Sequence, residues 1–266
     1  MCNANTRTPS GRDCVAALFL VSMLPGAPAT AADLTWNNVN ADWTVGPNWT
    51  PGGPPGVGDV AVINVANPQL NSDTTILGLN QGGGTLSGTG TLTVTGPSTW
   101  TAGTHTGTGT TQFNGTLAIS GAGTKSITGG RIVSAGNITT WSGNTANNNN
   151  TISIASTSTF NNSGTFTESN VFASTISGGT FNNSSTFNKT SATTTTISTV
   201  FNNTGTVNVD AGTMLMQAGG TSTGTFAIDA GAKLEMRNGT HILNNVTTSG
   251  DGTLEISTEN VGADAL

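Results

Sequence analysis

The sequence contains very little charge. Only 8% of its 266 residues are charged, and the formal net charge at pH 7 is −6. Proteins that bind nucleic acid present clustered Lys and Arg side chains to the phosphates. The basic residues beyond position 32 are too few and too scattered for such a cluster, so we expect no nucleic-acid partner; they are Lys125, Arg131, Lys189, Lys233 and Arg237.

The chain also lacks cysteine after its first residues, since Cys2 and Cys14 are the only two. A polar start, an apolar run over 14–24 and the small residues at 29–32 predict a secretory signal peptide over residues 1–32. A membrane anchor is the alternative, but this run is shorter than the roughly 20 residues that a bilayer requires. We therefore predict a secreted or cell-surface protein that starts at Ala32 or Asp33, without disulfides and without a transmembrane segment after cleavage.

Catalytic signatures are missing as well. The two histidines, His105 and His241, have no cysteine or carboxylate at a metal-ligand spacing, and we expect both on the surface. No Gly-x-Ser-x-Gly elbow is present to hold a nucleophile. The Gly82–Gly84 run has no lysine beside it to meet a phosphate. The sequence therefore predicts neither an enzyme nor a cofactor.

A short internal repeat dominates the part of the sequence that remains. Phe160–Phe166 reads FNNSGTF, 181–187 reads FNNSSTF, and 201–207 reads FNNTGTV. A unit of about 20 residues cannot bury an apolar face alone, so neighbouring units must stack and share one core. The repeat predicts a solenoid rather than a disordered low-complexity chain.

The unit itself has the pattern of a β-strand. The phrase Gly-Thr-apolar-x-apolar occurs at 90–94, 115–119 and 252–256, and apolar residues two apart lie on one face of a strand. No segment has the spacing of an amphipathic helix. We expect an all-β solenoid with almost no helix.

Equal residues one coil apart should lie about 4.8 Å from each other and form ladders. We therefore expect Phe181 to stack between Phe160 and Phe201 inside the core, with asparagine amides bonded to one another. Asparagine also tolerates the left-handed backbone of a tight corner, so we expect the Asn pairs at corners. Asn-x-Ser/Thr glycosylation is an alternative explanation of the same residues.

Residues 33–70 differ from the repeat because they contain three tryptophans, Trp36, Trp43 and Trp49. One interpretation is a cap, in which bulky side chains cover the open end of the first coil. The other is a carbohydrate platform, because a Trp ring offers a broad, rigid face to a sugar. The cap is favoured, since terminal repeats of solenoids are atypical.

The Trp-rich segment, the PPGVGDVAVI sequence and the GTLTV and FNNSGTF phrases together resemble bacterial surface proteins of the autotransporter adhesin type. That resemblance implies a right-handed parallel β-helix with a pectin-lyase-like cross-section. The residue patterns described above divide the chain into a signal peptide at 1–32, an N-terminal cap at 33–70 and parallel β-helix repeats at 71–266.

These observations favour a secreted structural or adhesive surface protein, with an extracellular or cell-wall glycan as partner. A polysaccharide lyase or hydrolase is an alternative. Its strongest candidates are Asp210 and Asp229, which a 19-residue echo places on consecutive coils, where they would bind Ca²⁺ or share acid and base roles. Solvated corners explain the same pair, with Lys233, Glu235 and Arg237 as ordinary charged surface. An ice-binding solenoid is the other alternative, although the threonines do not keep one phase between repeats.

Overall fold

The computed structural model describes residues 31–37, 41–143 and 150–257, which belong to one compact unit. The predicted signal peptide lies outside these residues except for Ala31 and Ala32, so it stays a prediction. Among the described residues the helical structure is a single 3-10 turn, η1 (Gly46–Asn48). No described helix has the length and apolar character needed to span a membrane.

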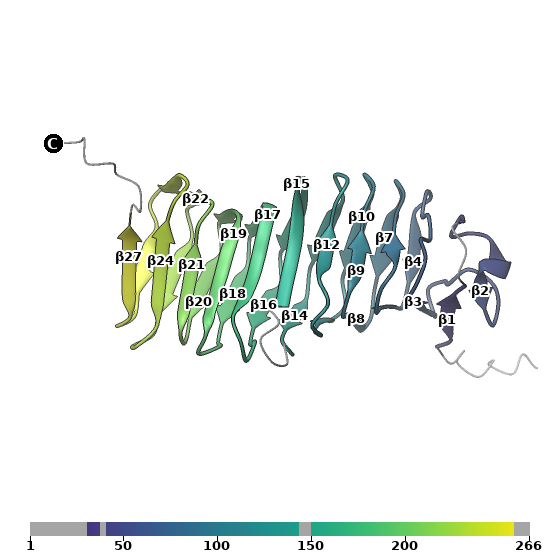
Figure 1. The fold of residues 1–266 in the computed structure, drawn as a ribbon, viewed down its shortest axis with the longest axis horizontal. Helices are drawn as coiled ribbons and strands as arrows, with labels where there is room; N and C mark the ends of the chain where they lie inside the picture. The colour runs from purple at the N-terminus through teal and green to yellow at the C-terminus, as the bar shows by residue number, and fades with distance from the viewer. Residues whose placement is uncertain (1–30, 38–40, 144–149, 258–266) are drawn as a thin grey trace, which may run out of the picture. The chain divides into compact units, whose positions relative to one another are not determined.

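The unit is a stack of coils of about 21 residues, seen side-on in Figure 1. Each strand pairs in parallel with the strand one coil away, except where β2 meets β1 antiparallel. The predicted parallel β-helix is therefore confirmed. A 12-stranded sheet contains, in spatial order, β2 (Trp49–Thr50), β1 (Asp33–Trp36), β3 (Val60–Ile63), β5 (Gly78–Gln81), β8 (Ser98–Trp100), β11 (Leu117–Ile119), β14 (Ile138–Trp141), β16 (Thr165–Glu168), β18 (Thr186–Lys189), β20 (Thr206–Val209), β23 (Thr225–Ile228) and β26 (Thr247–Ser249).

The 15-stranded sheet wraps around the rest of each coil. Its main path runs through β27 (Thr253–Ser257), β24 (Lys233–Arg237), β21 (Thr213–Met216), β19 (Thr194–Asn203), β17 (Ser174–Asn183), β15 (Asn150–Asn162), β13 (Ile132–Ala135), β10 (Thr110–Phe113), β7 (Thr91–Val94) and β4 (Thr74–Ile76). Off this path lie β6 (Thr85–Leu86), β9 (Gly103–His105), β12 (Lys125–Ile127), β22 (Gly220–Ser222) and β25 (His241–Leu243).

Each coil has three faces. We call the 12-stranded sheet face 1, and the long strands β15, β17 and β19 divide the other sheet into two. The first halves of these strands form face 2 together with the strands paired to them, such as β12 and β21. The second halves form face 3 together with β13 and β22, which pair with them. The bend in β17 falls at Gly178, where φ is +76° and a Cβ atom would lie 2.1 Å from the Ile154 carbonyl oxygen. Only glycine fits this bend.

The core consists of inward side chains that form columns along the stack. The Phe181 ring lies between Phe160 and Phe201, with centroid distances of 5.0 and 5.3 Å and interplanar angles of 8° and 11°. Phe166 and Phe187 form a second stack, which meets the first edge-on. All five rings are buried, so the predicted aromatic ladder is confirmed.

The asparagine pairs form two ladders. Inside, Asn162 donates to the Asn183 carbonyl oxygen at 2.7 Å, and Asn183 donates to Asn203 at 2.8 Å. Outside, equivalent bonds of 2.9 Å join Asn161, Asn182 and Asn202. The predicted amide ladder is confirmed, but the predicted corner position is wrong. These asparagines lie within β15, β17 and β19, and the described non-glycine residues with positive φ are Ala66, Asn238 and Asn245.

Candidate binding faces and buried polar groups

Outward side chains of face 1 form straight rows, because the strands pair in unbroken register. One row begins at Ile138 and continues on the next five coils with threonine alone, at Thr165, Thr186, Thr206, Thr225 and Thr247. The expectation that threonine does not keep its phase between repeats is therefore wrong for this row. The row was visible in the sequence, because Thr165, Thr186 and Thr206 hold the same position of the repeats FNNSGTF, FNNSSTF and FNNTGTV.

The neighbouring row of face 1 is mixed. It contains Thr140, Thr167, Asn188, Asn208, Ala227 and Ser249 in successive coils. Asn208 donates to the Asn188 carbonyl oxygen at 2.8 Å, which fixes the amide orientation. A complete Thr-x-Thr pair in these coils occurs at Thr165 and Thr167. Face 1 thus presents one uniform hydroxyl row beside one row of hydroxyls and amides.

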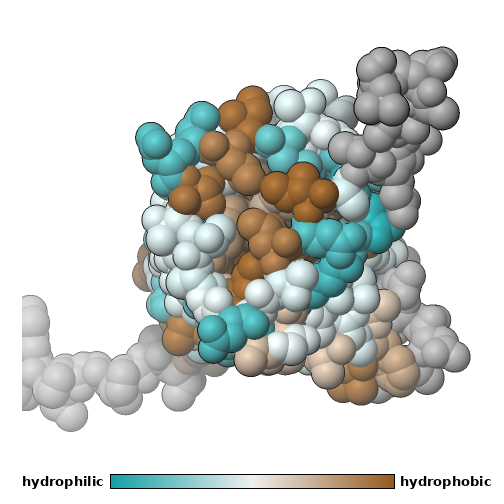
Figure 2. All heavy atoms as spheres, turned by 90° about the vertical axis from the view of Figure 1, so that its left-hand side faces the viewer, coloured by the Kyte–Doolittle hydropathy of each residue, from teal (hydrophilic) through white to brown (hydrophobic). Residues whose placement is uncertain are grey.

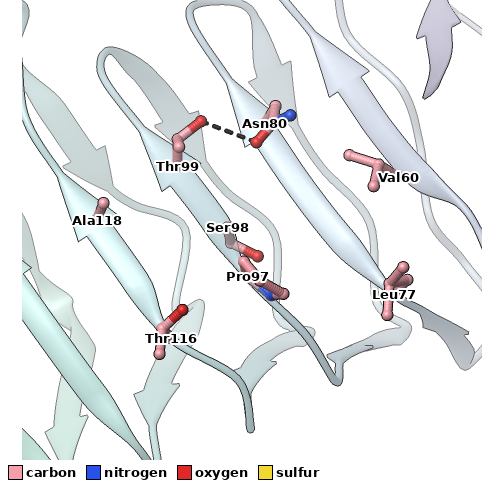
Figure 3. Close-up of a pocket in the computed structure, with 8 residues that line it drawn as sticks. All are labelled: Val60, Leu77, Asn80, Pro97, Ser98, Thr99, Thr116 and Ala118. Atoms are coloured by element: carbon pink, nitrogen blue, oxygen red, sulfur yellow. Dashed lines mark hydrogen bonds between the residues drawn. The ribbon is translucent and has the colours of Figure 1, made fainter. Parts of the chain in front are cut away.

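A shallow hollow of about 430 Å³ lies on the same face, nearer the N-terminus. Figure 3 shows its floor between β3, β5, β8 and β11, and its lining is Val60, Leu77, Asn80, Pro97, Ser98, Thr99, Thr116 and Ala118. Thr99 donates to the Asn80 side-chain oxygen at 2.9 Å and forms a polar rim. Gly78, which pairs with Val60, has no side chain and leaves space on this face. A larger residue does not fit there, because its Cβ atom would lie 2.6 Å from the Pro97 carbonyl oxygen. The hollow joins an apolar floor to a hydroxyl and amide edge.

The three N-terminal tryptophans are buried. The exposed fractions of Trp36, Trp43 and Trp49 are 2%, 1% and 2%. Trp49 meets the other two rings edge-on, at centroid distances of 5.0 and 4.6 Å, and its indole N–H donates to the Trp43 carbonyl oxygen at 2.8 Å. Their faces pack against each other and the core, as expected of the cap and not of the sugar platform. We correct the platform interpretation on this ground.

Asp210 and Asp229 lie side by side on consecutive coils, because Val209 pairs with Ile228. Both side chains are exposed. Reduced hydration raises the pKa of Asp210, and the negative charge of Asp229 raises it further. Ala232 N–H donates to the Asp229 carbonyl oxygen at 2.9 Å, which closes a turn. Among the described residues, no group of three His, Cys, Asp or Glu side chains gathers at a metal-ligand geometry.

The charged residues of β24 form a compact group with the next coil. Lys233 contacts Glu235 at 2.9 Å and Glu255 at 2.6 Å, and Arg237 pairs with Glu235. Lys233 and Arg237 are partly exposed, as expected of a surface. Glu235 is only 4% exposed, because its two cationic neighbours cover it, so the prediction of a surface position is wrong for this residue. These pairs lower the pKa of Glu235 and raise that of Lys233.

His105 is not on the surface, so that prediction is wrong. Its ring is fully buried, 4.6 Å from the Trp100 ring centroid, and its Nδ1 lies 2.9 Å from the Thr111 hydroxyl. The same hydroxyl accepts from Arg131 at 3.0 and 3.2 Å. Arg131 also donates to the carbonyl oxygens of Gly88, Thr106 and Thr110. A buried guanidinium therefore holds three coils together through neutral acceptors.

A second buried group follows the corner between faces 1 and 2. Lys125 donates to Asn150 at 2.7 Å, Asn150 to Asn170 at 3.0 Å, and Asn170 to Glu168 at 2.9 Å. Ser191 donates to the other Glu168 oxygen at 2.6 Å, and Lys189 donates to Ser191 at 2.9 Å. We call these six residues the polar column. Burial lowers the pKa of Lys125 and of Lys189 to about 8 each, although the charge of Glu168 opposes the shift at Lys189.

Sequence reasoning missed these buried charges, although their strand parity was visible. Lys189 shares the inward parity of Phe187, Glu168 that of Phe166, and Arg131 that of Val133. Charged side chains are rarely buried unless they are paired, so inward parity does not by itself predict their burial. Some of the partners that permit burial lie two residues along the chain, as Asn170 does from Glu168 and Ser191 from Lys189, and the others come from neighbouring coils.

Comparison with known protein families, curated proteins and solved structures gave no match to this chain. The parallel β-helix therefore stands on the structure alone. The comparisons give no support for the adhesin resemblance, for secretion or for a glycan partner.

Proposed function

We propose that this chain is a secreted, non-catalytic structural or adhesive protein that binds an extended extracellular or cell-wall polysaccharide along face 1. The observation that carries the proposal is the regular outward row of five threonines, flanked by hydroxyls and amides. Successive side chains within each row lie about 4.8 Å apart, which is close to the distance between successive sugar units in an extended glycan. Ser, Thr and Asn side chains both donate and accept, which suits sugar hydroxyls.

The hollow extends this face toward the N-terminus and adds an apolar floor. Sugar rings have one apolar face and a polar rim, and the hollow combines Val60 and Pro97 with the Thr99 and Asn80 pair. Ligand sites commonly combine an apolar lining with a few placed polar groups. Because face 1 carries little charge, we expect neutral rather than acidic polysaccharides as ligands.

Binding to a panel of soluble and insoluble polysaccharides tests this proposal. Thr99→Arg and Thr206→Arg each place a long charged side chain on face 1, and we expect both to weaken binding. Ser177→Arg, on an outward position of face 2, is the matched control and should bind like the parent. Equal loss in all three variants, or no binding by the parent, would contradict face 1 as the site. Release of soluble sugar from a bound polysaccharide would contradict the non-catalytic function and would direct attention to Asp210 and Asp229.

The threonine row also favours a second candidate, an ice-binding surface. A flat array of hydroxyl and methyl groups at one repeat distance is the feature such a surface requires. The mixed second row weakens it, because Asn188, Asn208 and Ala227 interrupt the pattern. Ice recrystallisation assays of the parent and of Thr206→Arg distinguish the two candidates, since only an ice-binding protein would inhibit crystal growth.

A further inference from the structure

The threonine row of face 1 is interrupted toward the N-terminus. Followed back along the strand register, the same row contains Ile138, Thr116, Pro97, Gly78 and Val60. Gly78 has no side chain, and the Pro97 ring is bonded back to its own backbone. Two neighbouring coils therefore contribute no extended side chain to the row. The hollow of about 430 Å³ lies at this interruption, as Figure 3 shows.

The floor of the hollow is apolar although it lies on an outer side of the stack. Its lining includes Val60, Leu77, Pro97 and Ala118, and all four are at least partly exposed. The apolar surface at the C-terminal end, seen at the centre of Figure 2, has a different origin. The inward residues of β27 are exposed there because no described strand pairs with its far edge. The floor of the hollow consists instead of surface side chains, at positions that the core does not require to be apolar.

One edge of the hollow presents a hydrogen-bond donor. Thr99 donates to the Asn80 side-chain oxygen at 2.9 Å, which fixes the orientation of that amide. The NH2 group of Asn80 consequently faces away from Thr99, toward the Val60 side of the hollow in Figure 3. No acceptor among the described residues contacts this NH2 group, so its N–H donors are available to a ligand.

An apolar floor beside an amide donor is complementary to an acetyl group. The methyl group of an acetyl group leaves water when it contacts the floor, and the carbonyl oxygen accepts from an N–H donor. A sugar that carries only hydroxyls fits less well, because a hydroxyl placed on the floor loses its bonds to water without replacement. A carboxylate or sulfate substituent also fits less well, because no residue that lines the hollow is charged.

We propose that the hollow binds the acetyl group of an N-acetylated or O-acetylated sugar residue. This inference rests on the proposed function, since the sugar belongs to the polysaccharide bound along face 1, and it names the class of that polysaccharide. The acetyl methyl group lies against Val60, Leu77 and Pro97, and the acetyl carbonyl oxygen accepts from Asn80. The volume of about 430 Å³ is within the range of small-ligand pockets, so the hollow also accommodates the ring that carries the acetyl group. Neighbouring sugars then continue along the threonine row.

Calorimetric titration with paired ligands tests the proposal. Chitohexaose and cellohexaose have the same linkage and the same number of sugars, but each sugar of chitohexaose has an acetamido group where cellohexaose has a hydroxyl. Burial of one methyl group and one neutral hydrogen bond predict that the parent binds chitohexaose about tenfold more tightly. Xylan with and without its acetyl esters is the equivalent pair for O-acetylated sugars, and a preference within either pair supports the proposal.

Two variants locate the acetyl group in the hollow. Asn80→Asp keeps the shape of the side chain and removes the N–H donors, and Ala118→Leu fills the floor with a larger side chain. Both positions are partly exposed, so both variants should fold like the parent, as circular dichroism can verify, and both should lose the preference for the acetylated ligand. Ala227→Leu is the matched control, because Ala227 lies in the same outward row as Ala118 but outside the hollow. This variant should keep the preference.

The outcomes separate the acetyl site from polysaccharide binding as a whole. Equal binding of acetylated and unacetylated ligands by the parent would overturn the acetyl site and leave polysaccharide binding along face 1 intact. A parent that binds neither member of either pair would overturn both. A preference that Asn80→Asp and Ala118→Leu leave unchanged, or that Ala227→Leu abolishes as well, would place the acetyl group elsewhere and overturn the proposal.

Discussion

The same interior columns run through two regions of the stack and are filled in different ways. In β15, β17 and β19 one column is Phe160, Phe181 and Phe201, whereas in β7, β10 and β13 the same column is Leu92, Thr111 and Val133. The adjacent column changes from Val94, Phe113 and Ala135 to Asn162, Asn183 and Asn203 along these strands.

This difference shows what the fold requires of each position. A column residue must point inward and fill its space, but it does not need to equal its neighbours. Equal residues add stacking between rings and bonds between amides, which unequal residues cannot make. We call the part of the stack around β7, β10 and β13 the unequal region, because its columns contain unequal residues. There the Arg131 contacts replace these interactions and connect Gly88, Thr106 and Thr110 across coils.

The largest expected effect is on the aromatic column. Phe181→Ala should lower the free energy of unfolding by about 3 to 5 kcal/mol, as deletions of buried aromatic rings do. Phe113→Ala is the control from the unequal region, where no phenylalanine lies above or below in the column. We expect its loss to be smaller by about 0.5 to 1.5 kcal/mol for each stacked pair. Urea unfolding followed by circular dichroism measures both, and an equal loss would remove the special contribution of stacking.

The second effect concerns pH and links the two regions, since Lys125 lies in the unequal part and Lys189 in the repeat. Both have a pKa of about 8 in the folded chain, against an ordinary value of 10.5. Between these values the unfolded chain binds more protons, so the free energy of unfolding should rise as pH rises from about 8 to 10.5. The rise is at most roughly 3 kcal/mol per lysine.

The sequence leaves few other groups in this pH window, the buried Arg131 with its pKa lowered to about 10 among them. It contains no tyrosine, and the remaining lysine, Lys233, has a raised pKa and so titrates above the window. Urea unfolding at several pH values between 7 and 10.5 should show the rise in the parent. The double variant Lys125→Met and Lys189→Met should show a profile that is flat below about pH 10, where Arg131, whose pKa burial lowers to about 10, begins to add a rise of its own. Stability that falls over this range in the parent would contradict the desolvation of the two lysines.

The third effect separates the inner and outer amide ladders of one coil. Asn183→Ala removes the bonds to Asn162 and Asn203 inside the core, so the Asn203 side-chain oxygen loses its donor, whereas the NH2 groups of Asn162 and Asn203 keep the Thr186 and Thr225 carbonyl oxygens. We expect a loss of about 2 kcal/mol. Asn182→Ala removes the equivalent outer bonds, which water can replace, and should cost less than about 0.5 kcal/mol. Equal losses in the two variants would show that burial does not distinguish the ladders.

Much of this architecture followed from the sequence because the signal was local. Alternation of apolar residues gave the strands, and the repeat around Phe160, Phe181 and Phe201 gave the stacking of coils. Burial of Arg131 did not follow, because its acceptors lie 20 to 43 positions away and are mostly backbone carbonyls, which every sequence has. The threonine row of face 1 was also a local signal, since Thr165, Thr186 and Thr206 hold one position of that same repeat.

The smallest effect tests the polar contacts of the unequal region, at Thr111. Its hydroxyl accepts from Arg131, so its own proton must point to His105 Nδ1. His105 is therefore neutral, with its proton on Nε2. Burial lowers the pKa of His105 well below 6.5, and the positive charge of Arg131 lowers it further. Nitrogen NMR of the ring should show this tautomer unchanged between about pH 5 and 8, the range in which an ordinary histidine titrates.

Thr111→Val keeps the shape of the side chain and removes the hydroxyl. The Arg131 NH2 groups retain three carbonyl acceptors, whereas Arg131 Nε–H loses its acceptor and His105 Nδ1 loses its donor, so the expected loss is about 1 to 2 kcal/mol. The lost bond should also shift the Nδ1 resonance of His105. In the repeat region the same column consists of phenylalanine and is apolar throughout. A valine at position 111 would make the column of the unequal region apolar throughout as well. A loss as large as that of Phe181→Ala would mean that the Arg131 contacts depend on this hydroxyl, and a His105 that titrates near pH 6.5 in the parent would contradict its burial.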